Sequence, residues 1–416
     1  MSDQEESEYE VIAVSKQQKS RSEVIVNDRI SSLPDSLLHH ILSFLPTREV
    51  VATSLLSKRW RPLWHSMPTF DFEGRGISSL DFFIQFVDAV LLLADWKPIE
   101  KFRLKCRTFC TLQNGLRFEY KRVPPTRINI WISTAINRKV EHFELCSDDN
   151  EYIVAASSIF NGTTIRVLKL NWVRLDIPSS VKLPSLKVMH LVKVKLTDYE
   201  CLANFLSGCA LLEELVLDVS VDDDGGGEEE GEGEEEEDFT VNIEKLEHLV
   251  LANVHSFLIN SKALTNVTCL QLYVDKPPVR DIPIFDKLNR LEISSVEYEH
   301  LKWVMECLRS CPKLEILMIN EIYVRDDSDR GREGALMEPT QDVPQCLLSH
   351  LKEFTLRDYD GWKWEFEIAR YIMENAKVLR TISIHCVYMD VDEKYKNLNM
   401  LASCPRGSEH CSFLFD

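Results

Sequence analysis

The sequence predicts an α/β chain in which a short helical block precedes a solenoid, a repetitive fold that builds a curved parallel sheet. Two observations support this prediction. Apolar residues recur at helical spacing between prolines in residues 33–64, and an apolar-x-x-apolar-x-apolar pattern then recurs eleven times in residues 99–384. Stretches between these copies, such as 201–206 and 301–308, have helical apolar spacing, so we expect helices on the convex side of the sheet.

A first helix is predicted after Pro34, which suits the first turn because its missing N–H group is not needed there. Pro46 is expected to end this helix, since a proline cannot continue it. The apolar residues between the two prolines lie at the one-, three- and four-residue steps of a single helical stripe. They are Leu37, Leu38, Ile41, Leu42 and Leu45.

A second helix is predicted to follow, capped by Thr47. Glu49 lies in its first turn, where the helix dipole favours an acidic side chain. Val50 and Leu55 then continue an apolar stripe. This second stripe extends the apolar surface begun by the first helix.

A third segment places Trp60, Leu63 and Trp64 three and four residues apart, so these side chains share one face if the segment is helical. Pro62 falls inside the segment and would remove a backbone hydrogen bond, so we expect a short or kinked helix. The block is under 40 residues long, too short to enclose a core without a partner or a following domain. It therefore predicts a protein-binding surface. The alternative is a helical subdomain that buries its own stripe.

Many residues of this block stand at fixed spacings that match a known motif. They are Leu33-Pro34, Leu37-Leu38, Ile41-Leu42-Ser43, Leu45-Pro46, Val50, Thr53-Ser54, Leu56-Ser57 and Lys58-Arg59-Trp60 through Trp64. The block, placed at residues 29–70, resembles the F-box found in large plant families. The resemblance implies docking on a Skp-type adaptor and, through it, on a cullin. The residues assigned to adaptor binding are Leu33, Pro34, Leu37, Leu38, Ile41, Leu42, Leu45, Pro46, Val50, Leu55, Trp60 and Trp64.

Composition indicates a globular protein of more than one domain, since the chain has 416 residues and 44% of them are hydrophobic. The 12 cysteines follow no signal peptide and include no C-x-x-C pair, so we expect buried thiols rather than disulfides or a zinc site. In the richest apolar stretch, the longest uninterrupted run is residues 89–94, far too short to span a membrane. We therefore expect no metal, no cofactor and no membrane association.

The net charge of −19 comes mostly from one segment, residues 222–238, which holds 12 acidic and no basic residues. Removing these twelve charges from −19 leaves only −7 for the rest of the chain. Like charges at this density, interspersed with glycine, predict a solvated and disordered loop. The alternatives are a calcium site or a site for a basic partner, but Gly226 stands where an EF-hand loop begun at Asp222 needs a third acid. Residues 1–28 are expected to be a disordered tail.

The eleven copies of the apolar pattern predict short strands, because the last two apolar residues of each copy alternate with a polar position. The copies are Ile99-Phe102-Leu104, Val140-Phe143-Leu145, Ile165-Leu168-Leu170, Leu186-Met189-Leu191, Leu212-Leu215-Leu217, Leu246-Leu249-Leu251, Val267-Leu270-Leu272, Leu288-Leu291-Ile293, Leu314-Leu317-Ile319, Leu351-Phe354-Leu356 and Leu379-Ile382-Ile384. Several copies add an apolar residue three positions further on, expected to turn the chain back: Val173, Val194, Val254, Val296 and Ile322.

These copies resemble the irregular leucine-rich repeats that follow plant F-boxes. We place the repeats at residues 140–335, after a linking helix and a first irregular repeat at 71–139, where Pro124 and Pro125 suggest a loop or insertion. The alternative is a non-repetitive α/β domain with similar strands. In a solenoid the concave side is open to solvent and suited to binding. Exposed strand positions predict that a protein target contacts Lys169, Lys187, His190, Glu214, His248, Gln271, Arg290, Glu292 and Met318.

The C-terminal region, residues 343–416, predicts a strand-helix-strand unit that caps the solenoid. Its helix has one apolar face, formed by Phe366, Ala369, Ile372 and Met373. The segments 343–354, 365–376, 379–385 and 403–408 resemble the FBD domain of the same plant proteins. Trp362 and Trp364 are interpreted as packing residues, with a ligand platform as the alternative.

No catalytic motif or phosphate-binding loop occurs in the sequence, so we expect a non-catalytic protein, although an enzyme with a cryptic site remains the alternative. The resemblance implies a substrate receptor of an SCF-type ubiquitin ligase, in which the F-box binds a Skp-type adaptor and the repeats bind a protein target. A second hypothesis is a non-degradative repeat scaffold whose F-box is vestigial. Nothing predicts nucleic-acid binding, and the expected location is the nucleus or the cytoplasm.

Overall fold

The computed structural model describes residues 29–30, 32–77, 79–113, 117–147, 151–221, 241, 243, 246–255, 258–274, 282–297, 300–323, 342–387 and 389–416. The expected tail at 1–28 and the expected acidic loop at 222–238 lie outside these residues. The chain divides into two compact units, Met1–Met67 and Pro68–Asp416. The F-box-like block therefore falls in the first unit except for its last three residues, and the repeats fall in the second.

The described part of the first unit contains four short helices. They are α2 (Asp35–Leu42), α3 (Thr47–Ala52) and the 3-10 helices η2 (Thr53–Leu55) and η3 (Leu63–Ser66), and prolines precede all of them except η2. Pro46 takes the N-cap position of α3, so the expectation that Thr47 caps this helix is wrong; Thr47 is its first helical residue and is buried. Pro62 directly precedes the four-residue η3, which confirms the short third helix.

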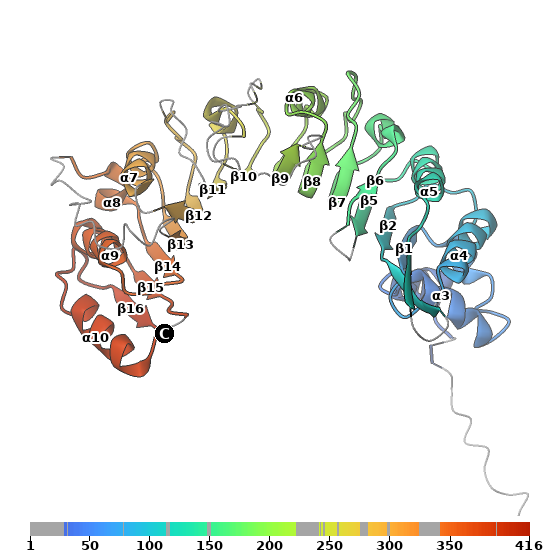
Figure 1. The fold of residues 1–416 in the computed structure, drawn as a ribbon, viewed down its shortest axis with the longest axis horizontal. Coiled ribbons are helices and arrows are strands. Elements are labelled where there is room, and N and C mark those ends of the chain that lie inside the picture. The colour runs from blue at the N-terminus through green and yellow to red at the C-terminus, as the bar shows by residue number, and fades with distance from the viewer. Residues whose placement is uncertain are drawn as a thin grey trace, which may run out of the picture. The chain divides into compact units, whose positions relative to one another are not determined.

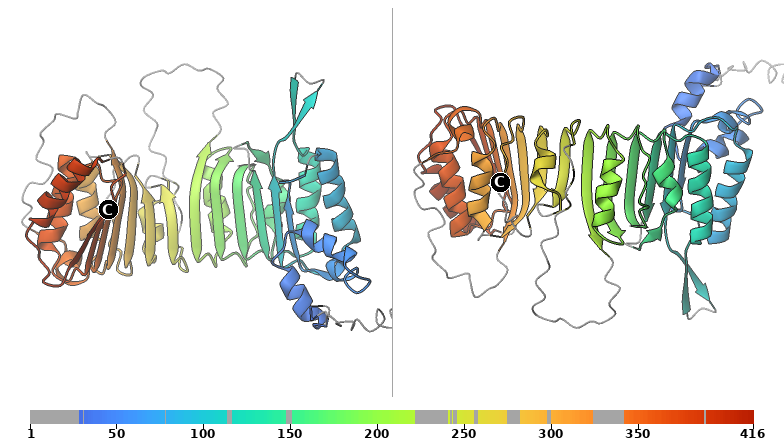
Figure 2. Two further views of the ribbon diagram at one scale, coloured as in Figure 1. Left: turned by 90° about the horizontal axis from the view of Figure 1, so that it is seen from below. Right: turned by 90° about the horizontal axis from the view of Figure 1, so that it is seen from above.

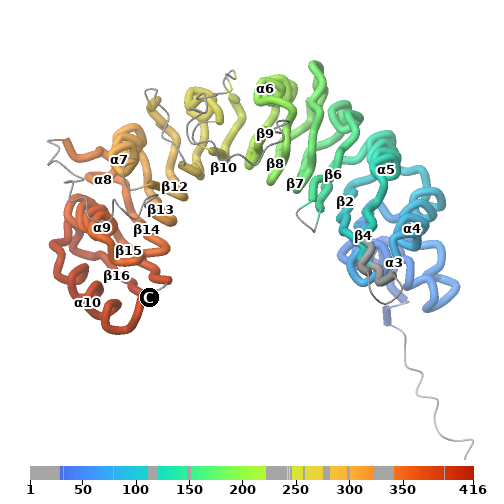
Figure 3. Tube along the Cα trace, viewed as in Figure 1, coloured from blue at the N-terminus to red at the C-terminus, as the bar shows by residue number. Residues whose placement is uncertain are grey.

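The second unit is built on one parallel sheet of fourteen strands, and the α/β solenoid predicted from the sequence is confirmed. The strands pair in chain order from β1 to β16, with β6 attached beside β7 and with β3 and β4 forming a separate antiparallel hairpin. Figure 1 shows the strands on the inner side of this unit and the helices on its outer side. The views in Figure 2 show the same two layers, and the chain trace in Figure 3 coils through them repeatedly.

The bounds of the strands are β1 Thr69–Glu73, β2 Lys101–Cys106, β3 Phe109–Gln113, β4 Arg117–Lys121, β5 His142–Ser147, β6 Ile153–Val154, β7 Val167–Leu175, β8 Val188–Leu196, β9 Glu214–Val221, β10 Leu251–His255, β11 Cys269–Tyr273, β12 Arg290–Glu297, β13 Ile316–Tyr323, β14 Glu353–Arg357, β15 Thr381–Ile384 and β16 Ser412–Phe415. The helices are α4 Leu80–Leu93, α5 Pro125–Asn137, η4 Ser157–Asn161, α6 Glu200–Ser207, η5 Ser261–Leu264, α7 Leu301–Arg309, α8 Gln345–Ser349, α9 Lys363–Asn375 and α10 Val391–Ala402. Helices α6 and α7 confirm the two convex helices expected from apolar spacing.

Ten of the eleven predicted apolar triplets occupy equivalent positions in the sheet, with their last two residues in register from strand to strand. The triplet at residues 246–251 is wrong, because Ala252 rather than Leu249 aligns with Leu215. The true triplet is Leu249-Ala252-Val254, in which alanine gives a weak apolar signal. Two further strands, β1 and β16, also continue the register but were missed.

Five units share a left-handed backbone residue two positions after the triplet. These residues are Trp172, Lys193, Ser295, Glu321 and Asp358, with φ between 51° and 56°. Each one shifts the in-and-out alternation of the strand by one residue, as a β-bulge does, so the following side chain again points inward. The buried side chains that follow are Val173, Val194, Val296, Ile322 and Tyr359. Val254, expected to belong to this set, is instead the third residue of its own triplet.

The region resembling an FBD domain continues the same sheet. Strands β14, β15 and β16 extend the parallel pairing beyond β13, so the predicted strand-helix-strand unit β14-α9-β15 is followed by a further helix, α10, and an end strand, β16. The buried residues of α9 are Trp364, Glu365, Ile368, Ala369, Ile372 and Met373, and Phe366 is only half-buried. The rings of Trp362 and Trp364 stack with centroids 5.1 Å apart, which supports their packing role.

Lys193 tests the left-handed position, because side chains branched at Cβ are strained there. Lys193→Val should lower the free energy of unfolding by about 1–2 kcal/mol relative to Lys193→Gly, and both variants lose the same ion pair to Asp218. Chemical denaturation of the two variants measures this difference. Lys169→Val, at a position of β7 without positive φ, is the control and should change stability by less than about 1 kcal/mol.

Glu365 gives a pH-dependent prediction. Its buried carboxylate accepts hydrogen bonds from the backbone N–H groups of Trp362 (2.9 Å) and Asp360 (3.1 Å), but burial raises the pKa of Glu365 from 4.5 to about 8. The folded state therefore binds this proton more tightly than the unfolded state, and the resulting stability is lost as the pH rises from about 4.5 to 8.

Comparison of Glu365→Gln with the unsubstituted protein isolates this titration, since glutamine stays neutral. Between pH 5 and pH 8, the unfolding free energy of the unsubstituted protein should fall relative to that of the variant, by at most about 1.4 kcal/mol per pH unit. A difference between the two proteins that stays constant with pH would show that Glu365 is ionised throughout.

Candidate functional site

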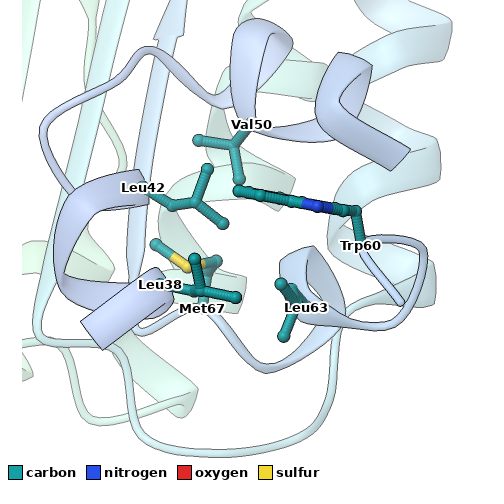
Figure 4. Close-up of a cluster of buried hydrophobic side chains, with 6 residues drawn as sticks. All are labelled: Leu38, Leu42, Val50, Trp60, Leu63 and Met67. Carbon is teal, nitrogen blue, oxygen red and sulfur yellow. The ribbon is translucent and has the colours of Figure 1, made fainter. Parts of the chain in front are cut away.

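The first unit buries a small apolar cluster of its own, drawn in Figure 4. The cluster consists of Leu38, Leu42, Val50, Trp60, Leu63 and Met67, with Leu33, Leu45 and Trp64 packed against it. Leu38, Leu42, Val50 and Trp60 were assigned to adaptor binding, but all four are buried within the unit, so they are not part of its accessible surface. The three helical segments thus enclose a core of their own, although the block was predicted to be too short to do so without a partner or a following domain.

The other part of the predicted stripe is exposed. Leu37 is 49% exposed, Ile41 is 45% exposed, and Leu55 is almost fully exposed. Phe44 and Leu56 are also exposed, although neither was assigned to adaptor binding. Leu37, Ile41 and Phe44 follow one another at four- and three-residue spacing, so this spacing alone could have identified Phe44. We call Leu37, Ile41, Phe44, Leu55 and Leu56 the apolar ridge.

The remaining predicted adaptor residues lie between these two groups. Leu33, Leu45 and Trp64 are half-buried against the cluster, so part of each side chain stays accessible. Pro34 is exposed before α2, and Pro46 is half-buried before α3. Each proline directly precedes its helix, so the two prolines fix where the helices begin. The accessible apolar surface of the unit belongs mainly to the apolar ridge.

Polar contacts hold α2 against the third segment. The His39 ring nitrogen Nε2 lies 3.2 Å from the Leu63 carbonyl oxygen and 3.1 Å from the Ser66 hydroxyl. The Arg59 guanidinium donates to Asp35 Oδ1 at 2.9 Å and also to the Leu33 carbonyl oxygen. These contacts hold α2 at its start and near its middle, so the helix presents Leu37 and Ile41 of the apolar ridge in a fixed orientation before any partner binds.

On the concave side of the second unit, charged side chains pair across neighbouring strands. The Arg103 guanidinium of β2 lies 3.2 Å from Asp71 on β1 and 3.0 Å from Glu144 on β5. Partial burial opposes the charge of Arg103, but the two carboxylates outweigh it and raise its pKa. Further along the sheet, His190 Nε2 lies 2.6 Å from Glu214 Oε1. The ionic groups at this end therefore largely neutralise one another.

Amide side chains form a second ladder on the concave side, from β10 to β13. Asn253 donates to Gln271 at 2.9 Å, and Gln271 donates to Glu292 at 3.4 Å. Asn320 donates to the same Glu292 oxygen at 2.8 Å. Half-buried apolar side chains, among them Val167, Val188, Val216 and Leu251, stand beside these polar groups on strands β7 to β10. The concave side thus offers an ionic stretch and an amide stretch, with apolar side chains on the strands where the two meet.

Most of the residues predicted to bind a target do lie on or beside the concave strands. Lys169, His190, Glu214, Gln271, Arg290 and Glu292 are strand residues, and Lys187 is exposed directly before β8. Two expectations are wrong. His248 lies in the turn before β10, because the register of this triplet was predicted three residues too early. The strand position that was expected for His248 belongs to Leu251, which aligns with Glu214 and Cys269. Met318 is only 6% exposed, with Arg290 Nη2 lying 3.0 Å from its sulfur. Target binding by these residues stays a prediction.

The remaining candidates for a chemical site in the described part of the chain are its thiols, possible metal ligands and pockets. Burial raises the pKa of the Cys209 thiol to about 12 and that of Cys346 to about 11, which keeps both protonated and poorly nucleophilic. No three His, Cys, Asp or Glu side chains gather into a metal site among the described residues, and none of their helices is long and apolar enough to cross a membrane. A pocket of about 260 Å³ beside β2 and α5 contains the Arg122–Glu151 ion pair.

Comparisons with known proteins match this architecture along the chain. The F-box domain model matches residues 30–72, the At1g61320/AtMIF1 LRR domain model matches 105–220, and the FBD model matches 338–384. The F-box/FBD/LRR-repeat protein At4g00160 of Arabidopsis thaliana is 31% identical over 94% of this chain and 95% of its own length. The F-box/FBD/LRR-repeat protein At4g26340 of the same plant is also 31% identical, over 94% of this chain and 100% of its own length. The chain belongs to the plant F-box/FBD/LRR-repeat family.

Membership of the F-box/FBD/LRR-repeat family confirms the resemblance seen in the sequence. The F-box match includes the apolar ridge and the buried cluster, and it extends into β1. The FBD match ends with β15, so α10 and β16 lie beyond it. The F-box match thus covers the helices of the first unit, the LRR match ends within β9, and the FBD match covers β14, α9 and β15.

Leu38 and its neighbour Leu37 should separate core stability from surface function. Leu38→Ala removes a buried side chain from the cluster and should lower the free energy of unfolding of the first unit by about 2–5 kcal/mol. Leu37→Ala, on the apolar ridge, should change it by less than about 1 kcal/mol. Hydrogen exchange of α2, followed by mass spectrometry, measures both effects in the full chain. Equal losses of protection would mean that the ridge is part of the core.

Proposed function

We propose that this chain is the substrate-recognition subunit of an SCF-type ubiquitin ligase. The observation that carries the proposal is the apolar ridge, which stays accessible on an F-box unit that already has its own core. The ridge side chains do not pack in the core of the unit, and several large apolar side chains exposed together indicate a site of protein interaction. The family supports a Skp-type adaptor as the partner that covers them.

Burial of the apolar ridge supplies the main driving force for adaptor binding. Covering a leucine, isoleucine or phenylalanine side chain contributes about 1.5–3 kcal/mol relative to leaving it exposed. Leu37, Ile41 and Phe44 project from one side of α2 and its C-terminal turn, so they can enter one continuous apolar groove on the adaptor. The hydrogen bonds from His39 and Arg59 reduce the ordering cost, because α2 needs no rearrangement to bind.

The concave side of the second unit holds the protein target in this proposal. Lys169, His190, Glu214, Gln271, Arg290 and Glu292 are retained as target-binding residues, together with Lys187 at the rim. His248 is left out, and Asn253 of the amide ladder is added. Their mixture of charges, amides and half-buried valines fits a protein surface better than a polyanion such as nucleic acid, which would call for a basic stripe. The target remains defined only by this complementarity.

The proposed mechanism is tethering rather than chemistry. The receptor joins the target to the adaptor and, through it, to a cullin, so that ubiquitin transfer becomes a reaction between held partners at high effective concentration. No side chain of this chain takes part in bond making in this mechanism. The activity belongs in the nucleus or the cytoplasm, where ubiquitin ligases of this type would meet the target.

The adaptor contact can be tested with matched apolar substitutions. The double variant Leu37→Ser with Ile41→Ser should weaken binding to a purified Skp-type adaptor by at least about 100-fold, since two ridge side chains lose their apolar contact. The control is Leu211→Ser with Leu348→Ser, residues of the second unit that are 43% and 42% exposed, against 49% and 45% for the ridge pair. The control should bind the adaptor with unchanged affinity in calorimetric titration.

The same variants discriminate a ligase receptor from a non-degradative scaffold. In plant cells, affinity purification of the unsubstituted chain should retrieve an adaptor and a cullin, and the ridge variant should retain its target without them, so that the target accumulates. Retrieval of a target without adaptor or cullin by the unsubstituted chain would favour the scaffold. Full adaptor binding by the ridge variant would show that the F-box uses another surface.

A further inference from the structure

The parallel sheet of the second unit ends at β16 with an open edge. In a parallel strand, alternate residues direct both backbone groups to the same neighbour. Ser412 donates its N–H group to the carbonyl oxygen of Arg380, just before β15, and Asp416 donates to that of Ile384 in β15. Phe413 and Phe415 therefore direct their backbone groups away from the sheet. No described residue pairs with this outer edge, which lies at the end of the sheet in Figures 1 and 2. Four backbone groups are thus available to another strand.

The apolar core also stops at this edge without a cover. Phe413 and Phe415 continue the inward register of Ile382 and Ile384, but they are half-buried, whereas the two isoleucines are buried. On the concave face of the same strand, Leu414 is 57% exposed. The end strand therefore presents apolar side chains on both of its faces next to unpaired backbone groups.

Helix α10 exposes an apolar stripe at the same end. Val391, Tyr395, Leu398 and Ala402 follow at spacings of four, three and four residues; Val391 and Tyr395 are largely exposed, and Leu398 is half-buried. A different face of the helix is turned inward, where Asn397 accepts the Tyr359 hydroxyl at 3.1 Å. The stripe therefore leaves apolar side chains exposed beside the polar residues Asp392, Glu393, Lys396 and Asn399.

We propose that the free end formed by β16 and α10 is the interface of a homodimer, with a second copy of this chain as its occupant. The end has two layers, a strand edge and a helical stripe. An extended peptide would cover the edge alone, and a single helix would cover the stripe alone. A two-fold axis perpendicular to the sheet places strand beside strand and helix beside helix, so a second copy covers both layers at once.

The strand register of this dimer follows from the open backbone groups. Antiparallel pairing centred on Leu414 sets Phe413 opposite Phe415 of the second copy, and the reverse. This pairing forms four hydrogen bonds and uses every outward N–H and C=O group of both Phe413 and Phe415. It also brings the two copies of Leu414 together on the concave face, and the phenylalanines continue the core across the junction.

The helices meet with matching shape and charge. Antiparallel packing sets Val391 opposite the small Ala402 of the second copy and Tyr395 opposite its Leu398. The first turn of α10 is acidic, with Asp392 and Glu393, and the exposed Arg406 follows the helix end. Antiparallel packing therefore brings opposite charges together at both ends of the helix contact. The resulting dimer carries two concave surfaces and two F-boxes.

Leu414 allows a test that separates loss of the interface from loss of folding. Leu414→Lys and Leu414→Glu each set like charges together at the two-fold axis and should weaken the dimer on the order of 100-fold. Mixing the two variants sets lysine against glutamate and should restore dimers. The control is Ile284→Lys, at an apolar residue of the second unit that is 64% exposed, which should leave the dimer unchanged. Sedimentation velocity on the full chain at micromolar concentration measures each state.

Dimers of twice the 48.2 kDa chain mass for the unsubstituted protein, monomers for each Leu414 variant and dimers for their mixture would support the proposal. A monomeric unsubstituted chain at micromolar concentration would overturn it. Dimers of both separate variants would place the interface elsewhere. Monomeric variants with unchanged melting temperatures that fail to recombine would exclude the two-fold register centred on Leu414.

Discussion

The structure depends on one repeated constraint, the register of inward apolar side chains between neighbouring parallel strands. Phe102, Phe143 and Leu168 stack in this way, and the same stacking continues strand by strand to Phe413. No unit could bury its apolar side chains alone, so the core exists only because the units are stacked. The concave positions follow from it, since a side chain next to an inward residue must point outward. The ionic and amide ladders are therefore consequences of the core register.

The first unit solves the opposite problem, because it must keep apolar residues on its surface. Its short helices divide one apolar stripe in two: Leu38 and Leu42 turn into the cluster, while Leu37 and Ile41 stay outside. The division needs an internal core large enough to hold the helices, and Trp60 supplies much of it. Such a surface is already formed before any partner binds, because the residues that stabilise the unit are different from those on its apolar surface.

Sequence reasoning reached the fold because triplets of large apolar residues repeat the same spacing. It failed where the signal was weak or ambiguous. Ala252 replaces a large residue, so the neighbouring leucines suggested a register shifted by three residues. Helical spacing showed that Leu37 and Leu38 share a stripe, but it could not show which one faces inward, because that depends on where the third segment packs. The burial of Met318 likewise depends on Arg290, a neighbour from another strand.

The amide ladder from Asn253 to Asn320 also sets a scale of length. Neighbouring strands lie about 4.8 Å apart, so functional groups recur at that distance along the ladder. An extended chain advances about 3.3 Å per residue, and three of its residues cover about 10 Å, close to two strand spacings. A target segment lying across the strands would thus match the ladder at every third residue. The sheet would then discriminate targets by the spacing of their side chains as well as by their chemical type.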